Sequence, residues 1–289
     1  MPASVTSGLA PADGTDLYYE RRGAGPPLLM ITGGGGDSGY YAAAADILAS
    51  DYTVITYDRR GNSRSRLHGE PVPITMAGQS ADAVAVLAAN GFGSAAIFGN
   101  SGGASIAFDL AARHPEVTEA VVAHEPPVPR VLADPREYLA QFDEIDRVLI
   151  TEGWQAAFTQ FQVRIGLVPP ARPEILAFLL KPASYLPPGP HRDTMIRISG
   201  NWPYMMRYEV RSFIDFTPEL DTIAGNGVKI AVACGAATRD PRAAEISDRA
   251  AALLGTDCVR FSGGHTAPTE MPRTFAPELA ALLARLDSA

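Results

Sequence analysis

Short apolar runs alternate with helix-like segments along most of this chain, and this alternation restricts its fold more than any other feature of the sequence. Some runs, such as 27–31, are continuous in apolar residues, as is typical of strands buried on both faces. The segments between them are rich in alanine or repeat apolar residues at three- and four-residue steps, which indicates helices. Together they predict an α/β fold, with a mostly parallel sheet flanked by helices.

The polar residues before position 17 show no strand pattern, and we expect the sheet to begin after them. With 289 residues and 46% hydrophobic content, the chain can bury one large core. The predicted strands are 17–21, 27–31, 53–57, 95–98, 119–123, 228–234 and 258–261, and the predicted helices are 40–50, 80–90, 101–113, 243–254 and 272–286.

The alternation stops between residues 126 and 222, where no continuous apolar strand occurs. Pairs of prolines separate helix-like segments in this part of the chain, which predicts an all-helical insertion. We therefore expect a core domain of residues 1–125 and 223–289, and a helical insertion of residues 126–222. The predicted helices of the insertion are 136–151, 154–165, 174–180 and 191–213.

Charge and composition limit the partners of the protein. With 24 Lys and Arg against 32 Asp and Glu, the formal net charge is −8, and an acidic surface repels nucleic acids and anionic lipids. No stretch reaches the ~18 apolar residues of a membrane span, and the first residues lack a signal-peptide pattern. We expect a cytoplasmic protein that binds neither nucleic acid nor membrane. Cys234 and Cys258 fit buried strands in a reducing compartment.

The segment Gly99-Asn100-Ser101-Gly102-Gly103 is a G-x-S-x-G pattern between a predicted strand and a predicted helix. In this context the glycines allow a sharp turn that presents the serine hydroxyl at the edge of the sheet. We predict that Ser101 is a nucleophile. The same five residues also occur by chance in glycine-rich loops, so the prediction depends on finding its partners.

A second glycine-rich loop, Thr32 to Gly36, follows the predicted strand 27–31. Free backbone N–H groups at the end of a buried strand can hold a phosphate or an oxyanion. The spacing fits neither of the common nucleotide-binding glycine motifs. A flexible turn without function is the other interpretation.

A serine nucleophile needs a base, and His265 is the best candidate among the five histidines. It follows the last predicted strand on a glycine turn, from which a loop residue can reach back over the sheet edge. His114 fits a helix end, His68 and His191 fit solvated loops, and His124 fits a supporting position beside Glu125.

Two carboxylates compete to orient this base. The turn after strand 228–234, where such an acid is common, carries alanine and threonine, and only Asp240 follows. Glu125 ends the strand next to the serine's own strand and could reach His265 from there. We favour Glu125, with Asp240 as the alternative.

The predicted insertion is rich in large apolar side chains, most of which we expect to pack against the core. The cluster 202–206 fits packing and the wall of an apolar pocket equally well. The candidate substrate contacts in the insertion are Trp154, Trp202, Tyr204, Met205 and Met206.

Over nearly its whole length the chain resembles the α/β-hydrolase superfamily with a helical cap. The resemblance rests on the elbow, the glycine loop, the turn Asp58-Arg59-Arg60-Gly61 and Gly264-His265. More narrowly, it resembles the zearalenone lactonases, fungal enzymes that open a macrocyclic lactone. Those enzymes have a His-Glu-x-Pro turn, as in His124-Glu125-Pro126-Pro127, and a turn without the usual Asp, as in Gly235-Ala236-Ala237-Thr238.

The resemblance implies a role for several residues. In that family the Glu after the sixth strand is the triad acid, which here is Glu125. The oxyanion donors correspond to the N–H groups of Gly34 and Gly102, and Gly35 is a further candidate substrate contact. A tryptophan that packs on the lactone in that family is replaced by Met205, which implies a changed or broader substrate.

We therefore expect a serine hydrolase that cleaves an ester or lactone of a mainly apolar small molecule, without a metal or organic cofactor. A homodimer is compatible with the sequence. Two alternatives stay open: the same fold acting as a C–C hydrolase or lyase, and a ligand-binding sensor with little turnover.

Overall fold

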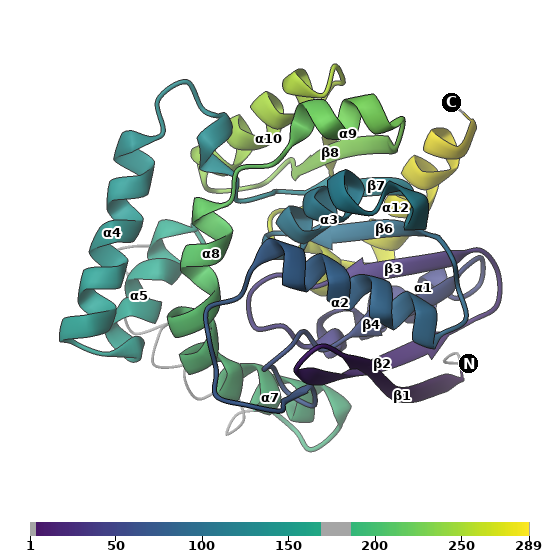
Figure 1. Cartoon of the computed structure of the whole chain (residues 1–289), viewed down its shortest axis with the longest axis horizontal. Helices are drawn as coiled ribbons and strands as arrows, with labels where there is room; N and C mark the ends of the chain where they lie inside the picture. Colours follow the sequence, from purple (N-terminus) through teal and green to yellow (C-terminus); the bar gives the residue numbers. More distant parts are fainter. Residues whose placement is uncertain (1–3, 169–185, 289) are drawn as a thin grey trace.

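The computed structural model describes residues 4–168 and 186–288, and in these residues nine strands form one sheet (Figure 1). The strand order is β1-β2-β4-β3-β6-β7-β8-β9, with β5 paired to β2. From β4 to β9 neighbouring strands are parallel, whereas β1, β2 and β5 pair in antiparallel fashion. The strands are β1 (Val5–Ala12), β2 (Thr15–Arg22), β3 (Pro27–Ile31), β4 (Thr53–Tyr57), β5 (Arg66–Leu67), β6 (Ala95–Asn100), β7 (Thr118–His124), β8 (Lys229–Gly235) and β9 (Val259–Phe261).

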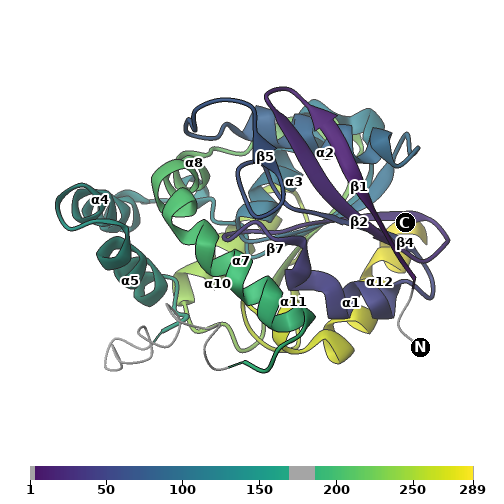
Figure 2. The same ribbon diagram turned by 90° about the horizontal axis from the view of Figure 1, so that it is seen from below.

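Helices cover both faces of the sheet, which confirms the predicted α/β architecture. Seen from below, α1 and α12 lie on the opposite side of the sheet from α2 and α3 (Figure 2). The helices of the core are α1 (Ala42–Leu48), α2 (Met76–Ala89), α3 (Gly102–Arg113), α10 (Pro241–Leu253), α11 (Ala267–Glu270) and α12 (Pro272–Ser288), with short 3₁₀ turns η1 (Ser38–Tyr41) and η2 (Pro115–Val117).

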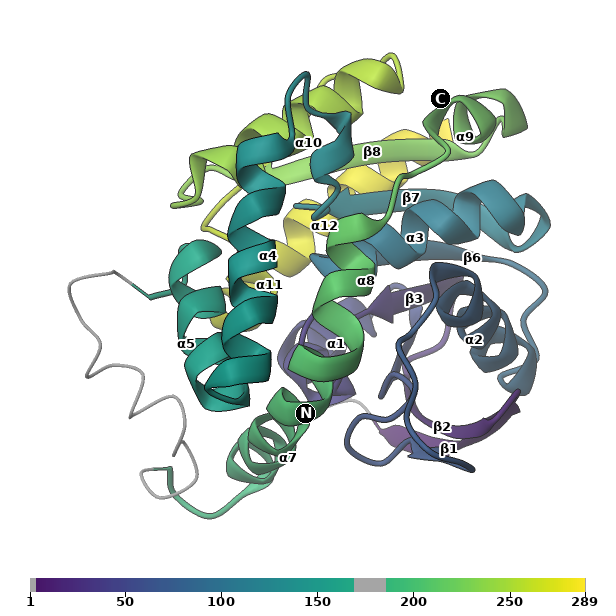
Figure 3. The same cartoon turned by 60° about the vertical axis from the view of Figure 1, so that its left-hand side comes forward.

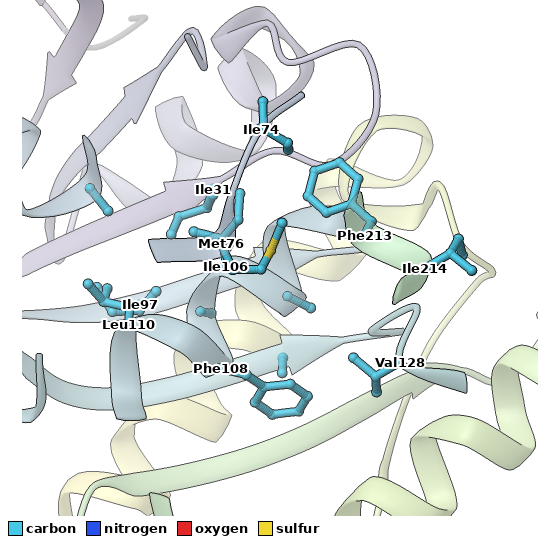
Figure 4. Packing of buried hydrophobic residues seen from close by; sticks show 14 of the residues in the cluster. Ile31, Ile74, Met76, Ile97, Ile106, Phe108, Leu110, Val128, Phe213 and Ile214 are labelled. Atoms are coloured by element: carbon cyan, nitrogen blue, oxygen red, sulfur yellow. The ribbon is translucent and has the colours of Figure 1, made fainter. Parts of the chain in front are cut away.

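Strand β3 shows why the central strands are continuous apolar runs. Successive side chains of a strand point to opposite faces, and both faces of this sheet are covered. Leu29 and Ile31 join the cluster under α2 and α3, whereas Leu28 and Met30 join the cluster under α1 and α12. All four side chains are fully buried. Figure 4 shows part of the first cluster, around Ile31, Ile97 and Phe108.

The chain between β7 and β8 contains only helices and turns in its described part. Helices α4, α5, α7 and α8 gather in front of the sheet, whereas α9 packs against α3 of the core (Figure 3). The predicted helix 174–180 lies outside the described residues. The elements are η3 (Pro129–Val131), α4 (Arg136–Thr151), α5 (Trp154–Arg164), α7 (Pro190–Tyr204), the π-helical turn η5 (Met205–Glu209), α8 (Val210–Asp215) and α9 (Leu220–Asn226).

The predicted helix 191–213 is divided by the π-helical turn η5. Pro203 lies inside α7, two residues before this turn. A proline lacks the N–H that would continue the helical ladder, and the widened turn follows this interruption. The turn brings Met205 against Gly34 and Glu209 against Arg59, both residues of the core.

Strand β1 was not expected, because its sequence carries no apolar run. Val5 and Leu9 are 50% and 58% exposed, so this edge strand has little apolar surface to bury. It pairs with β2 on one side only, through the hairpin turn at Asp13 and Gly14, where Gly14 has a φ of 72°. The Asp-Gly pair is the signal that predicts such a hairpin.

None of the described helices combines the length and the apolar character needed to cross a lipid bilayer. Both cysteines are free thiols, Cys234 buried and Cys258 partly exposed.

Candidate active site

Ser101 occupies a strained turn between β6 and α3. Its φ and ψ are 56° and −128°, a conformation that residues with a side chain rarely adopt. The turn requires glycine at its flanks, because a Cβ at Gly99 would lie 2.2 Å from the Gly103 carbonyl oxygen. A Cβ at Gly103 would in turn lie 2.1 Å from the oxygen of Ile31 in β3. Strand and helix are thus packed as closely as the predicted elbow requires.

The structure brings His265 and Glu125 together at the same edge of the sheet. His265 follows β9, and its Nδ1 lies 2.7 Å from Oε2 of Glu125, the residue directly after β7. A carboxylate accepts, so Nδ1 carries the hydrogen and Nε2 of the neutral ring is left to accept a proton. His265 and Ser101 line the same cavity.

Glu125 is itself held in place by backbone and side-chain donors. Its carboxylate is buried, and Oε1 accepts from the Gly235 N–H at 2.8 Å and from the Thr238 hydroxyl. Burial alone would raise the pKa of Glu125, but the hydrogen bond and charge of His265 lower this pKa to about 2. The side chain is therefore ionised at neutral pH.

Asp240, the alternative acid, is engaged elsewhere. It is the N-cap of α10 and accepts from the Arg242 N–H at 3.0 Å. Its other oxygen lies 3.0 Å from Nη1 of Arg164 in α5. Its side chain thus joins the helical insertion to the core, and the structure brings Glu125, not Asp240, to His265.

Two polar residues that sequence reasoning gave little weight complete the surroundings of this pair. Asn100 Nδ2 donates to Nδ1 of His124 at 2.8 Å and to the backbone oxygen of His265 at 3.3 Å. His124 is fully buried and stacked on Phe261, and burial lowers the pKa of its ring to about 4, so the ring is neutral. The pattern G-x-S-x-G does not specify its second residue, which is why Asn100 was missed.

The glycine loop packs against the elbow. A Cβ at Gly33 would lie 2.7 Å from Cβ of Ser101, and one at Gly34 would lie 2.8 Å from Sδ of Met205. In the described residues, the N–H groups of Gly34 and Gly102 have no backbone acceptor. Both glycines line a cavity that Ser101 also lines, so their N–H groups are available to a ligand there.

Two neighbouring cavities meet at Ser101. The larger, of about 110 Å³, contains His265 and polar side chains of the core and of α5. The smaller, of about 50 Å³, is lined mainly by apolar side chains of the insertion. Met205 belongs to the walls of both cavities. Residues common to both are Gly34, Ser101, Phe161, Ile165 and Met205.

The structure places only part of the predicted cluster in these cavities. Met205 lines both cavities and Trp202 lines the larger one. Tyr204 instead packs on Tyr208 and faces another cavity, about 310 Å³ in volume, at the start of α2. Met206 is buried in the core cluster, and Trp154 packs against that cluster from α5. Gly35, with a φ of 81°, packs against Trp202 and does not line either cavity. The residues 202–206 are divided because a helix turns adjacent side chains to different faces, so residues that cluster in the sequence need not cluster in space.

Several cavity residues were not predicted. Phe161 of α5, Ile165 directly after α5 and Phe213 of α8 line the apolar cavity, and their spacing indicates only that these helices are amphipathic. In the described part of the chain, no group of three or more His, Cys, Asp or Glu side chains could hold a metal ion.

Comparison with known proteins agrees with the observed fold. Residues 26–152 match the family model for the alpha/beta hydrolase fold. The chain is 29% identical over 281 residues to the uncharacterized hydrolase YraK of Bacillus subtilis, covering 96% of this chain and 95% of that protein.

Two solved structures share the fold. An alpha/beta hydrolase from Sphaerobacter thermophilus is 24% identical with a TM-score of 0.69, covering 96% of this chain and 100% of that one. The enol-lactonase from Burkholderia xenovorans LB400 is 19% identical with a TM-score of 0.68, at the same coverage of 96% and 100%. With its strand order, its serine elbow and these matches, the chain has the α/β-hydrolase fold.

Proposed function

We propose that this protein is a serine hydrolase that cleaves an ester or lactone through an acyl-enzyme, with Ser101, His265 and Glu125 as its triad. The observation that carries the proposal is the 2.7 Å contact of the buried Glu125 carboxylate with His265, which lines the same cavity as the strained Ser101. A histidine oriented by an ionised acid is the base that a serine hydroxyl requires.

The reaction divides into two steps. The Ser101 hydroxyl attacks the substrate carbonyl while Nε2 of His265 takes its proton, and the N–H groups of Gly34 and Gly102 stabilise the oxyanion. His265 then gives the proton to the leaving alcohol, which for a lactone stays attached to the acyl chain. Water, deprotonated by His265, releases the acid and restores Ser101. Glu125 stabilises the imidazolium in both steps.

The cavities support an apolar substrate of modest size. The volume of about 110 Å³ is several times the ~30 Å³ share of a water molecule but below the ~300 Å³ where drug-sized pockets begin. A macrocyclic lactone of the kind suggested by the zearalenone-lactonase resemblance needs the insertion, or Met205 within it, to move. We propose that residues 126–222 act as a cap over Ser101.

The fold of the Burkholderia enol-lactonase makes lactones a sensible first substrate class, although the same fold serves other reactions. We propose a cytoplasmic enzyme that acts on a small molecule without a cofactor, and a homodimer is compatible with this proposal.

The test is a comparison of substrate classes on the purified protein. We expect hydrolysis of short-chain aryl esters or lactones, labelling by a serine-directed phosphonate, and loss of both in Ser101→Ala. Hydrolysis of meta-cleavage-type diketones in place of esters would support the C–C hydrolase alternative. Ligand binding without turnover or labelling would support the sensor.

A further inference from the structure

Arg59 is a fully buried cation that holds the glycine loop from the core side. Its Nε donates to the Thr32 carbonyl oxygen at 3.0 Å, and its Nη2 donates to the Gly33 oxygen at 2.9 Å. The planar guanidinium presents its donors in a fixed geometry, so two bonds to consecutive carbonyls fix both peptide planes.

The second of these planes belongs to the peptide between Gly33 and Gly34. The peptide bond is trans, so the Gly33 oxygen and the Gly34 N–H point in opposite directions. The oxygen is bound by Arg59 and also by the Gly36 N–H at 3.2 Å. The N–H of Gly34 therefore points away from Arg59, and Gly34 lines both cavities at Ser101.

The counter-ion of Arg59 comes from the helical insertion, 150 residues later in the chain. Glu209 accepts from Nη1 at 2.9 Å and from Nη2 at 2.8 Å, and both side chains are fully buried. Asn62 also donates to Glu209 at 2.8 Å. Glu209 ends the π-helical turn that begins at Met205, the residue in contact with Gly34.

The next helix of the insertion covers the second oxyanion donor. The ring of Phe213 lies 5.2 Å from Cζ of Arg59, and a Cβ at Gly102 would lie 2.7 Å from that ring. Figure 4 shows Phe213 pointing from α8 into the cluster that contains Ile31, Ile74 and Met76. The segment 205–213 thus contacts both proposed oxyanion donors and the cation behind them.

We propose that Arg59, paired with Glu209, is a positioning residue for the oxyanion hole. It fixes the direction of the Gly34 N–H, and its charge polarises the Gly33–Gly34 peptide so that this N–H is a stronger donor. Glu209 makes the arrangement depend on the docking of segment 205–213. This inference rests on the proposed serine hydrolase function.

The experiment removes both charges together, so that neither is left buried without a partner. The full chain carrying Arg59→Met with Glu209→Met keeps side chains of similar volume, an exchange that many proteins tolerate. The matched control is Arg60→Met with Asp82→Met. Within the described residues this neighbouring pair, with a contact of 2.6 Å, makes no hydrogen bond to the glycine loop, and Asp82 is 1% exposed.

Hydrolysis of a short-chain aryl ester and inhibition by an aryl trifluoromethyl ketone are measured for each protein. The ketone forms a tetrahedral oxyanion with a nucleophilic serine, so its affinity reports the oxyanion hole directly. Phosphonate titration gives the concentration of active sites, and thermal melting checks folding.

In the double variant at 59 and 209 we expect kcat to fall about tenfold to a hundredfold, with KM within about twofold. The affinity for the ketone should fall by the same factor as kcat. The control double variant at 60 and 82 should keep kcat, KM and the affinity for the ketone within about twofold of the wild type. Equal parameters in the two double variants would overturn the positioning role while leaving the hydrolase proposal intact.

Arg59→Lys serves if the double variant does not fold. Lysine keeps the charge beside Glu209 but lacks the fork that reaches two carbonyls, so we expect a smaller fall in kcat and ketone affinity. Wild-type kcat in a folded Arg59→Lys protein would overturn the proposal. A wild-type protein without hydrolysis or phosphonate labelling would instead remove the proposed function, and this inference with it.

Discussion

Glu125 Oε2 lies 2.7 Å from His265 Nδ1, although 140 residues separate the two in the chain. The strand order β7-β8-β9 explains this contact, because Glu125 follows β7 and His265 follows β9. The Gly235 N–H at the end of the intervening β8 donates to Glu125 and holds its carboxylate across the gap. The acid is therefore fixed by the sheet itself, two strands from the base.

Replacing this acid separates the two candidates for the role. We expect Glu125→Gln to lower kcat by about 10³- to 10⁴-fold, because the amide no longer stabilises the imidazolium. Asp240→Asn is the matched control; Asn still caps α10, and only the ion pair with Arg164 is lost. We expect its kcat to stay within about twofold in a steady-state ester assay. The reverse outcome would assign the role to Asp240.

We expect the stabilisation that the ionised Glu125 gives the folded state to be lost in acid. Burial opposes ionisation, but the hydrogen bond and charge of His265 lower the pKa of Glu125 from 4.5 to about 2. The unfolded state then binds more protons in acid, so the contribution is complete above pH 4.5 and is lost as the pH falls toward 2.

Urea unfolding of the wild type and of Glu125→Gln across this pH range measures the effect. The difference between their free energies of unfolding should shrink as the pH falls, since other carboxylates titrate equally in both proteins. A difference that does not change with pH would contradict the lowered pKa.

Met205 should limit the length of the acyl group. It lines both cavities at Ser101, so we expect Met205→Ala to join them and admit longer chains. We expect the ratio of kcat/KM for a hexanoate ester to that for an acetate ester to rise about tenfold. Met206→Ala is the control, because Met206 is 3% exposed and lines neither cavity. Each of the two substitutions should lower the free energy of unfolding by about 2–5 kcal/mol. An unchanged ratio in Met205→Ala would show that it does not divide the site.

The elbow should not tolerate a methyl group at Gly103. A Cβ there would lie 2.1 Å from the Ile31 oxygen, which belongs to a central strand that has no room to shift. We expect Gly103→Ala to lower the free energy of unfolding by about 3 kcal/mol or more. Gly93→Ala, where a Cβ meets nothing within 4 Å, should change it by less than ~0.5 kcal/mol. Similar unfolding curves for the two variants would contradict the close packing.

The central sheet could be predicted because its signal is local. Strand β3 was predicted with its observed bounds, since both of its faces are buried and every residue in the run is apolar or proline. The edge strand β1 was missed because most of its side chains are exposed, and its pairing depends on the backbone and the turn at Gly14.

The site could be predicted only where a short motif or a strand end specifies it. Ser101 stands in such a motif, and His265 and Glu125 each follow a predicted strand. The pairing of Arg59 with Glu209 depends on how the insertion docks, and no local pattern reports a contact between residues 150 positions apart. The same holds for Phe213, whose apolar character is equally compatible with the core and with the cavity wall.

The strained turn at Ser101 has a consequence for protein engineering. Among the described residues, three that are not glycine have a positive φ: Ser63, Ser101 and Glu125. Such conformations each cost about 1–3 kcal/mol, and glycine would relieve that cost at residue 101 while deleting the proposed nucleophile. A selection for thermostability alone would thus favour an inactive sequence at this position. Libraries made from this protein need an activity screen alongside any stability screen.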